Sequence, residues 1–144
     1  MALLTPALWT FVAGARVARM ATVDARGRPA VLPICFCLQG DALFSVIDEK
    51  PKRVEGRRLQ RLRNLAAHPD MAVVVDVWDE DWTRLAWVML RGEGSVLDRA
   101  DDLPQVLAEL RAKYPQYTSM ALEARPLIRM TLTGVRHWGR IPGA

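Results

Sequence analysis

The chain has 144 residues, of which 51% are apolar and 25% charged, and its formal net charge is +4. This length and composition predict one globular domain and argue against a disordered or fibrous chain. No segment approaches the roughly 20 apolar residues that cross a bilayer, and residues 1–15 lack the basic start and apolar run of a secretion signal, so we expect a cytoplasmic protein with no membrane partner.

The first third of the sequence predicts a short helix followed by strands. Thr5-Pro6 is typical of a helix start, and we expect a helix from Pro6 to about Ala15. Three strands joined by short turns would then form an antiparallel meander, at residues 17–23, 29–39 and 42–47. Pro33 lies inside the second of these strands and predicts a bulge, or a position without a ladder hydrogen bond.

The rest of the chain alternates short helices and strands. A helix is expected over 59–67, ended by His68-Pro69, and another from a cap at Asp101-Asp102 to Lys113. Three further strands are expected, at residues 71–78, 85–98 and 127–138. Gly92 and Gly94 predict bends or bulges. Six antiparallel strands with short helices between them predict a mainly β fold, and closure into a barrel would remove the exposed edges.

The cysteines and histidines do not form a metal-binding pattern. Cys35 and Cys37 lie two residues apart in a predicted strand, so they share a face, and this geometry rarely closes a disulfide. His68 and His137 are distant in the sequence, and zinc needs a fuller ligand set. We therefore expect two reduced, buried, structural thiols and no metal site.

The sequence is rich in tryptophan, with five such residues. Burial in the core is the ordinary expectation for each of them, and contact with a planar ring or a dimer interface is the alternative. Trp78, Trp82 and Trp87 surround the acidic turn at residues 79–81. Adjacent acids on a turn point in different directions, so we expect this turn to be solvated and not to bind metal.

A basic cluster is the most informative local feature, and it consists of Lys50, Lys52, Arg53, Arg57, Arg58, Arg61 and Arg63. It spans a predicted loop and the start of a predicted helix, where free backbone N–H groups and guanidinium groups suit a phosphate. A solvated basic face is the plain alternative. Nucleic acid is a third reading, disfavoured because the cluster lacks interleaved aromatic residues and no recognition motif accompanies it. No catalytic motif is present, so a bound cofactor would supply any chemistry.

Family resemblance is carried by three segments, VARMATVDARGRPAVLPICF, DALFSVIDEKPKR and RLRNLAAHPDMAVVVD. They are similar to the pyridoxamine 5′-phosphate oxidase-like superfamily of split β-barrels. The next stretch, DEDWTRLAWVMLRGEGSVLD, resembles its branch of probable F420-dependent oxidoreductases, the FDOR-B type. The resemblance runs over residues 17–98 and more weakly to Trp138. It implies a six-stranded antiparallel split β-barrel of the FMN-binding type, and a homodimer with cofactors in grooves at the subunit interface.

The resemblance also implies which residues contact the cofactor. Arg61 stands three residues before Asn64-Leu65, where related sequences carry the Lys or Arg that holds the cofactor phosphate. The loop with Lys52 and Arg53 would meet that phosphate or the oligoglutamate tail of F420. The strands would line the ring, with Trp87 near it and Trp138 reaching the partner's site. The full set of implied cofactor contacts is Leu32, Pro33, Ile34, Cys35, Ser45, Val46, Ile47, Asp48, Lys52, Arg53, Arg57, Arg58, Arg61, Asn64, Trp87 and Trp138.

The activity implied by the resemblance is an F420-dependent oxidoreductase that passes a hydride from the reduced deazaflavin to a small electron-poor substrate. Quinones, unsaturated lactones and tetrapyrroles are the substrate classes that the family suggests. No side chain is expected to be an obligate catalytic acid. The alternatives on the same fold are an FMN-dependent oxidase or reductase, and a non-enzymatic protein that stores cofactor or binds haem or nucleic acid. The run from Lys50 to Arg53 is longer than in FMN-binding members, which favours F420 mildly.

Overall fold

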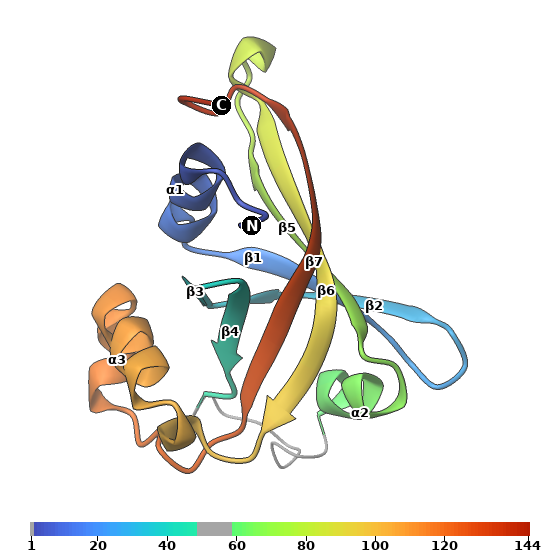
Figure 1. The fold of residues 1–144 in the computed structure, drawn as a ribbon, viewed down its shortest axis with the longest axis vertical. Coiled ribbons are helices and arrows are strands. Elements are labelled where there is room, and N and C mark those ends of the chain that lie inside the picture. The colour runs from blue at the N-terminus through green and yellow to red at the C-terminus, as the bar shows by residue number, and fades with distance from the viewer. Residues whose placement is uncertain (1, 49–58) are drawn as a thin grey trace.

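A single curled antiparallel β-sheet organises the chain (Figure 1). The structure is a computed structural model that describes residues 2–48 and 59–144. The strands in these residues are β1 (Ala18–Val23), β2 (Pro29–Ile34), β3 (Cys37–Gln39), β4 (Ala42–Val46), β5 (Asp70–Val77), β6 (Ala86–Leu97) and β7 (Leu127–Gly139). Their order in the sheet is β2-β1-β5-β6-β7-β4-β3. The predicted mainly β class is confirmed.

Three α-helices and three 3-10 turns accompany the sheet in the described residues, namely α1 (Pro6–Gly14), α2 (Gln60–Ala67), α3 (Pro104–Lys113), η2 (Trp82–Arg84), η3 (Ala100–Asp102) and η4 (Pro115–Ser119). The start of α1 is as predicted, because Thr5 Oγ1 accepts a hydrogen bond from the Leu8 amide. The predicted cap of α3 at Asp101-Asp102 is wrong. Proline has no amide hydrogen and favours the first helical turn, so the helix begins at Pro104 and the two aspartates form η3.

The predicted strand over 29–39 is two strands. β2 ends at Ile34 and pairs with β1, whereas β3 pairs with β4, so the expected meander is not formed and the sheet has seven strands in place of six. β2 and β3 are the two edges of the sheet, yet only Cys35 and Phe36 separate them in sequence. The sheet must therefore curl until its edges approach, which gives the split-barrel shape. Pro33 causes no bulge, because an edge strand needs no ladder bond on its outer side.

The irregularity predicted for the strand over residues 85–98, which is β6 in the structure, occurs at Gly92. The pairing of β6 with β7 shifts register between Arg91 and Gly92. A Cβ atom at Gly92 would lie 2.3 Å from the carbonyl oxygen of Thr131, so only glycine fits this close approach. The bulge lets a twelve-residue strand bend around the barrel.

Two apolar clusters hold the fold together. The barrel interior is filled by alternate residues of the strands, with Met20, Val73 and Leu90 almost fully buried there. A second cluster joins α3 and η4 to the outside of β4, through Phe44 and Leu110 among others. This second contact brings the residues that follow α3 against the end of β4.

The opposite side of the central strands, which we call the outer face, carries the alternate side chains. Strand register places these outer-face residues in rows across the sheet: Arg19, Ala21, Val31, Ala72, Val74, Asp76, Trp87, Met89, Arg91, Arg136 and Trp138. None of them is fully buried, and Val31 is 68% exposed. A largely apolar sheet face of this width is thus left open by the described residues of one chain.

The tryptophans depart from the expectation of burial. Trp78, Trp82 and Trp138 are 65%, 69% and 53% exposed. Trp9 and Trp87 are half-buried. Trp78 and Trp82 contact each other edge to face near the acidic turn. Trp78 and Trp82 lie in the connection between β5 and β6, and Trp138 lies in β7, so the expectation of burial in the core is wrong for these three.

Candidate functional site

A pocket of about 410 Å³ lies where the ends of β2 and β4 meet the segment after α3. We call it the Asp48 pocket, and its lining residues are Arg16, Cys35, Asp48, Tyr114, Gln116, Tyr117 and Met120. Cys35 and Asp48 come just after β2 and β4, so the edges of the sheet fix their positions. The lining combines a guanidinium, a carboxylate, a thiol and two phenols, and such a set suits a ligand with polar and charged groups.

Asp48 is held firmly on one wall. Asp48 is 6% exposed, and its carboxylate Oδ2 accepts a hydrogen bond of 3.1 Å from the Tyr117 hydroxyl. Arg125 donates to the carbonyl oxygens of Ile47 and Asp48, at 2.9 and 3.3 Å. Burial raises the pKa of Tyr117, and the neighbouring Cys35 and Asp48 raise it further. The phenol therefore stays protonated and remains a hydrogen-bond donor.

Arg61 lies on the first turn of α2, and its guanidinium interacts electrostatically with the Asp48 carboxylate. Burial lowers the pKa of its guanidinium, and attraction to Asp48 and Tyr117 opposes that shift. Its Nε atom is buried and has no hydrogen-bond partner among the described residues. A buried donor without an acceptor is costly, and a guanidinium of this kind fits the anionic group of a ligand. The residues at this position thus suit the phosphate of a bound cofactor.

Arg16 and Tyr114 form the other wall. The Arg16 guanidinium lies 4.7 Å from the centre of the Tyr114 ring and donates to the Lys113 carbonyl oxygen at 2.7 Å. The Tyr114 hydroxyl accepts from the Phe36 amide at 3.1 Å and donates toward the Arg16 carbonyl at 3.1 Å. Tyr114 thereby ties the link between β2 and β3 to the end of α3.

Lys113 is a second buried cation close to this wall. Its Nζ lies 3.7 Å from the centre of the Phe36 ring and, among the described residues, has no hydrogen-bond partner. Burial lowers the pKa of its ammonium to about 8, while Cys37 acts in the opposite direction. Lys113 does not line the Asp48 pocket, and its ammonium group instead packs against the face of the Phe36 ring.

The structure brings together only some of the residues that the sequence assigned to the cofactor. Cys35 and Asp48 line the Asp48 pocket, and Arg61 is not in its lining but interacts electrostatically with Asp48. Three other assigned residues, Ser45, Val46 and Ile47, are at most 4% exposed, so their side chains belong to the interior.

The assigned residues of β2 are spread over both sides of the strand. Ile34 is 7% exposed and packs in the barrel core. Leu32 is half-buried against the same core, and Pro33 is exposed on the edge strand. Four further assigned residues lie outside the described part of the chain: Lys52, Arg53, Arg57 and Arg58.

Asn64 has an internal role in the structure. It is 1% exposed, and its Nδ2 donates to Thr22 Oγ1 at 3.0 Å. Trp87 and Trp138 are cross-strand neighbours in β6 and β7, on the outer face and away from the lining of the Asp48 pocket. Apart from the assigned residues that are buried in the interior, Cys35 and Asp48 lie at the pocket, whereas Trp87 and Trp138 lie on the outer face.

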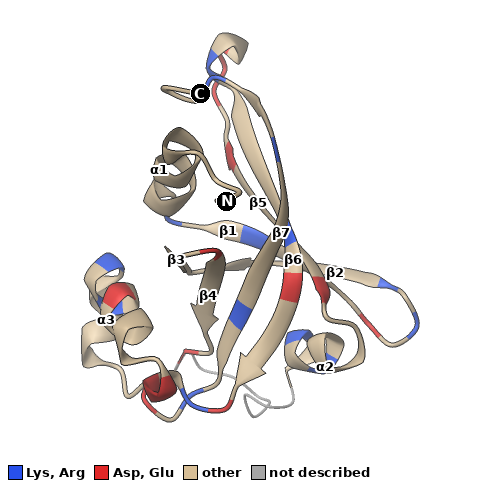
Figure 2. Cartoon of the chain, in the orientation of Figure 1, with Lys and Arg blue, Asp and Glu red and all other residues tan. Residues whose placement is uncertain are grey.

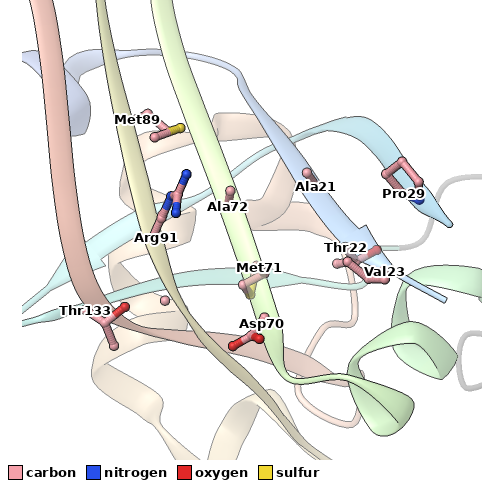
Figure 3. Close-up of a pocket in the computed structure, with 11 residues that line it drawn as sticks. Ala21, Thr22, Val23, Pro29, Asp70, Met71, Ala72, Met89, Arg91 and Thr133 are labelled. Atoms are coloured by element: carbon pink, nitrogen blue, oxygen red, sulfur yellow. The ribbon is translucent and has the colours of Figure 1, made fainter. Parts of the chain in front are cut away.

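The outer face has hollows of its own. One of about 450 Å³ is floored by small residues such as Ala21 and Ala72, with Met89 and Arg91 beside them (Figure 3). Another, of about 540 Å³, is lined by Arg19, Val74, Asp76, Trp87 and Met89. Arg19 and Asp76 form an ion pair of 2.8 Å within it. In the sequence, this face is indicated by the alternation of residues along β5 and β6, because every second side chain points away from the core.

Sequence reasoning missed Arg16, Tyr114 and Tyr117 as pocket residues. The helix predicted to end at Lys113 does end there, and Tyr114 follows it directly. Nothing local to these residues indicates that α3 folds back onto β4, because that contact joins segments far apart in the chain. The two thiols are free, and Cys37 is 2% exposed, but Cys35 is half-buried and lines the pocket.

The described residues hold neither a metal-binding cluster nor a membrane-spanning helix. In residues 2–48 and 59–144 no group of His, Cys, Asp and Glu side chains is arranged to hold a metal ion. Within the same ranges, no helix combines the length and apolar character needed to cross a membrane.

Solved structures with the same fold have low sequence identity to this chain. Rv2991, a conserved hypothetical protein from Mycobacterium tuberculosis, matches with a TM-score of 0.75 and 16% identity over 96% of this chain and 86% of its own. HutZ, the heme storage protein from Vibrio cholerae, matches with a TM-score of 0.70 and 20% identity over 94% of both chains. An F420 reductase matches with a TM-score of 0.59 and 20% identity over 83% of this chain and 88% of its own.

These structural likenesses establish the fold. No curated protein sequence matches the chain significantly. The family model for pyridoxamine 5′-phosphate oxidase matches residues 4–139, nearly the whole chain. The chain therefore belongs to the pyridoxamine 5′-phosphate oxidase family.

Proposed function

We propose that this protein is an F420-dependent oxidoreductase that acts on a small electron-poor substrate. The observation that carries the proposal is the buried Nε of Arg61, which has no hydrogen-bond partner among the described residues. A phosphate there would supply the missing acceptor and a charge-assisted hydrogen bond. The position of Arg61 before Asn64 and the fold shared with an F420 reductase support the same assignment.

The residues of the chain would bind and orient, while the reduced deazaflavin would supply the hydride. Arg61 would hold the phosphate end, and the Asp48 pocket would enclose part of the ring system or substrate. Cys35 and Met120 give the pocket an apolar side that limits water, and Tyr117 offers a protonated hydroxyl that donates hydrogen bonds. Hydride transfer in this scheme requires no obligate acidic side chain.

A homodimer is part of the proposal, and the outer face supports it. That face is broad and largely apolar, and a second copy packed against it would bury Val74, Met89 and Trp87. Trp87 and Trp138 would then lie at the boundary between subunits, where the resemblance places the cofactor grooves. The separation of the assigned residues into two groups is expected if each site uses both chains.

FMN and haem are the competing ligands. The family suggests FMN, and the similar fold of HutZ suggests haem. Haem would need an axial ligand, and the two histidines are exposed at the end of α2 and in β7, outside the lining of the Asp48 pocket. Arg61 suits an anionic group, which the phosphates of F420 and FMN both provide, and the longer basic run from Lys50 to Arg53 favours F420 between these two.

A titration panel tests the assignment. Purified protein is titrated with F420, FMN and haem, with deazaflavin or tryptophan fluorescence and haem absorbance as the signals. We expect F420 to bind in the micromolar range or tighter. Replacement of Arg61 with Ala should weaken it by about 1.5–3 kcal/mol, the range for a charge-assisted contact. Arg84→Ala, which removes an equally positive but 65% exposed side chain beside Asp81, is the control and should bind normally.

Three results would overturn the assignment. Absence of F420 binding at tens of micromolar rejects the proposed cofactor. Tighter binding of FMN or haem replaces it with that ligand. Equal affinity of the Arg61→Ala variant and the wild type removes Arg61 from the site.

A further inference from the structure

Two cations share the aromatic wall of the Asp48 pocket. The guanidinium carbon of Arg16 lies 4.7 Å from the centre of the Tyr114 ring, and the Nζ atom of Lys113 lies 5.4 Å from the same centre. Arg16 belongs to the link between α1 and β1, whereas Lys113 ends α3. Figure 2 shows basic residues at both places. Burial lowers the pKa of Lys113 most, and repulsion from Arg16 lowers it further, so the two charges are close enough to interact.

Within residues 2–48 and 59–144, neither cation forms an ion pair with a carboxylate. The Nζ atom of Lys113 is buried without a hydrogen-bond partner there, and Arg16 donates through Nη2 to the Lys113 carbonyl oxygen at 2.7 Å. A guanidinium carries five N–H groups, so most donors of Arg16 have no protein partner in these ranges. Positive charge that is not neutralised at the wall of a pocket attracts an anion.

Arg16 is held in position although it lies at the surface. Its guanidinium stacks on the Tyr114 ring and bonds the end of α3, and its own carbonyl oxygen accepts from the Tyr114 hydroxyl at 3.1 Å. Both the backbone and the side chain of Arg16 are therefore tied to the same aromatic residue. An arginine held in this way has already lost part of its side-chain freedom, so binding an anion costs less order.

The opposite wall of the pocket is acidic. Asp48 lies there, with its Oδ2 bonded to the Tyr117 hydroxyl, and Cys35 and Met120 also line the pocket. A ligand with one anionic group would place that group at Arg16, because the Asp48 carboxylate repels it from the other wall. Its uncharged part would then contact Cys35 and Met120. A second anionic group at the far end of the ligand would meet Asp48 and be disfavoured.

We propose that Arg16 makes the Asp48 pocket selective for a small unsaturated or aromatic substrate that carries a single carboxylate, and this inference rests on the proposed function. The pocket, of about 410 Å³, has room for a molecule of that kind. Arg16 is then the residue that determines substrate specificity, whereas Arg61 holds the phosphate of the cofactor. The carboxylate at Arg16 fixes one end of the substrate and leaves the unsaturated part in the interior of the pocket.

The test uses two probes of nearly equal shape, trans-cinnamate and the uncharged trans-cinnamamide. Each is titrated calorimetrically into wild type, Arg16→Gln and Arg16→Lys, and the same samples are titrated with F420. The neutral amide reports whether the pocket persists in each variant. Arg84→Gln is the matched control, because it also removes an exposed charge but lies in η2 and does not line the pocket.

We expect wild type and Arg84→Gln to bind cinnamate more tightly than the amide, by roughly 10-fold, with a preference that weakens in added salt. Arg16→Gln should lose the preference and keep its affinity for the amide, and Arg16→Lys should retain part of the preference because it keeps the charge. If Arg16→Gln binds neither probe, Arg16→Lys decides, since loss of the preference there overturns the inference.

Two further results would overturn the inference and leave the proposed function intact. One is equal wild-type affinity for the two probes, or no binding of either at millimolar concentrations, while F420 binds. The other is an Arg16→Gln variant that keeps the full preference for cinnamate. Failure of wild type to bind F420 would instead reject the proposed function, and the inference about its substrate with it.

Discussion

Replacement of Tyr114 with Phe tests how much the Tyr114 hydroxyl, which bonds the segment between β2 and β3, contributes to the stability of the fold. The hydroxyl accepts from the buried Phe36 amide at 3.1 Å and lies 3.1 Å from the Arg16 carbonyl oxygen. Phenylalanine keeps the ring and its packing but leaves that amide without its acceptor. A buried group that loses its partner costs about 1–3 kcal/mol, so we expect this loss in the free energy of unfolding at pH 8. For a domain of this size it corresponds to a fall in Tm of about 2–4 °C for each kcal/mol.

The same variant should also change how the free energy of unfolding depends on pH above pH 10. Burial raises the pKa of Tyr114 to about 12, against about 10 in an unfolded chain. The unfolded chain loses its proton first, so the stability present below pH 10 declines as the pH rises from 10 to 12. This decline amounts to about 2–3 kcal/mol for Tyr114 alone, and the variant should lack it. Tyr117, the only other tyrosine, would leave a residual alkaline slope.

Urea titrations followed by tryptophan fluorescence at pH 8, 10 and 11 measure both effects. The reasoning is refuted if Tyr114→Phe has the wild-type midpoint at pH 8 together with the wild-type alkaline slope. A change at pH 8 alone would mean that the hydroxyl bonds Phe36 but titrates normally.

Two further predictions concern stability. Burial lowers the pKa of Lys113 to about 8, below its unfolded value near 10.4, so the unfolded chain holds more protons between these values and Lys113 adds stability as the pH rises from 8 to 10. Cys37, whose pKa burial raises from 9.0 to about 12, acts in the opposite direction above pH 9. The stability of Lys113→Met relative to wild type should therefore fall from pH 8 to 10 in urea titrations, and a constant difference would contradict the assignment. Gly92→Ala should destabilise the fold by about 1–3 kcal/mol or more, because its Cβ would press on the Thr131 carbonyl. Gly134→Ala, whose Cβ would meet nothing closer than 3.9 Å, is the control, and equal losses in the two variants would refute the packing argument.

Local patterns in the sequence predicted most of the elements. β5 and β6 are long and strongly alternating, so their periodicity identified them to within about one residue. The start of α1 and the end of α2 at His68 follow from capping and from the proline that comes next. The bulge at Gly92 was predicted because glycine in a strand usually marks such a site.

The failures come from interactions between distant parts of the chain. Residues 29–39 read as one apolar strand, and nothing local shows that the chain leaves one sheet edge at Cys35 and joins the other at Cys37. The same holds for Tyr114 and Tyr117, which reach the site only because α3 packs on β4. The exposed tryptophans are a related case, since burial depends on what covers a side chain and not on its type.

The position of β7 has a consequence for how the protein is made. This strand inserts between β6 and β4, and among the described residues β4 pairs only with it and with the short β3. On the ribosome, β4 must wait with an unpaired edge until residues 127–131 emerge, more than eighty residues after β4 itself. Completion of the sheet therefore waits for the last part of translation. Until then the unpaired edge of β4 is open to pairing with another chain.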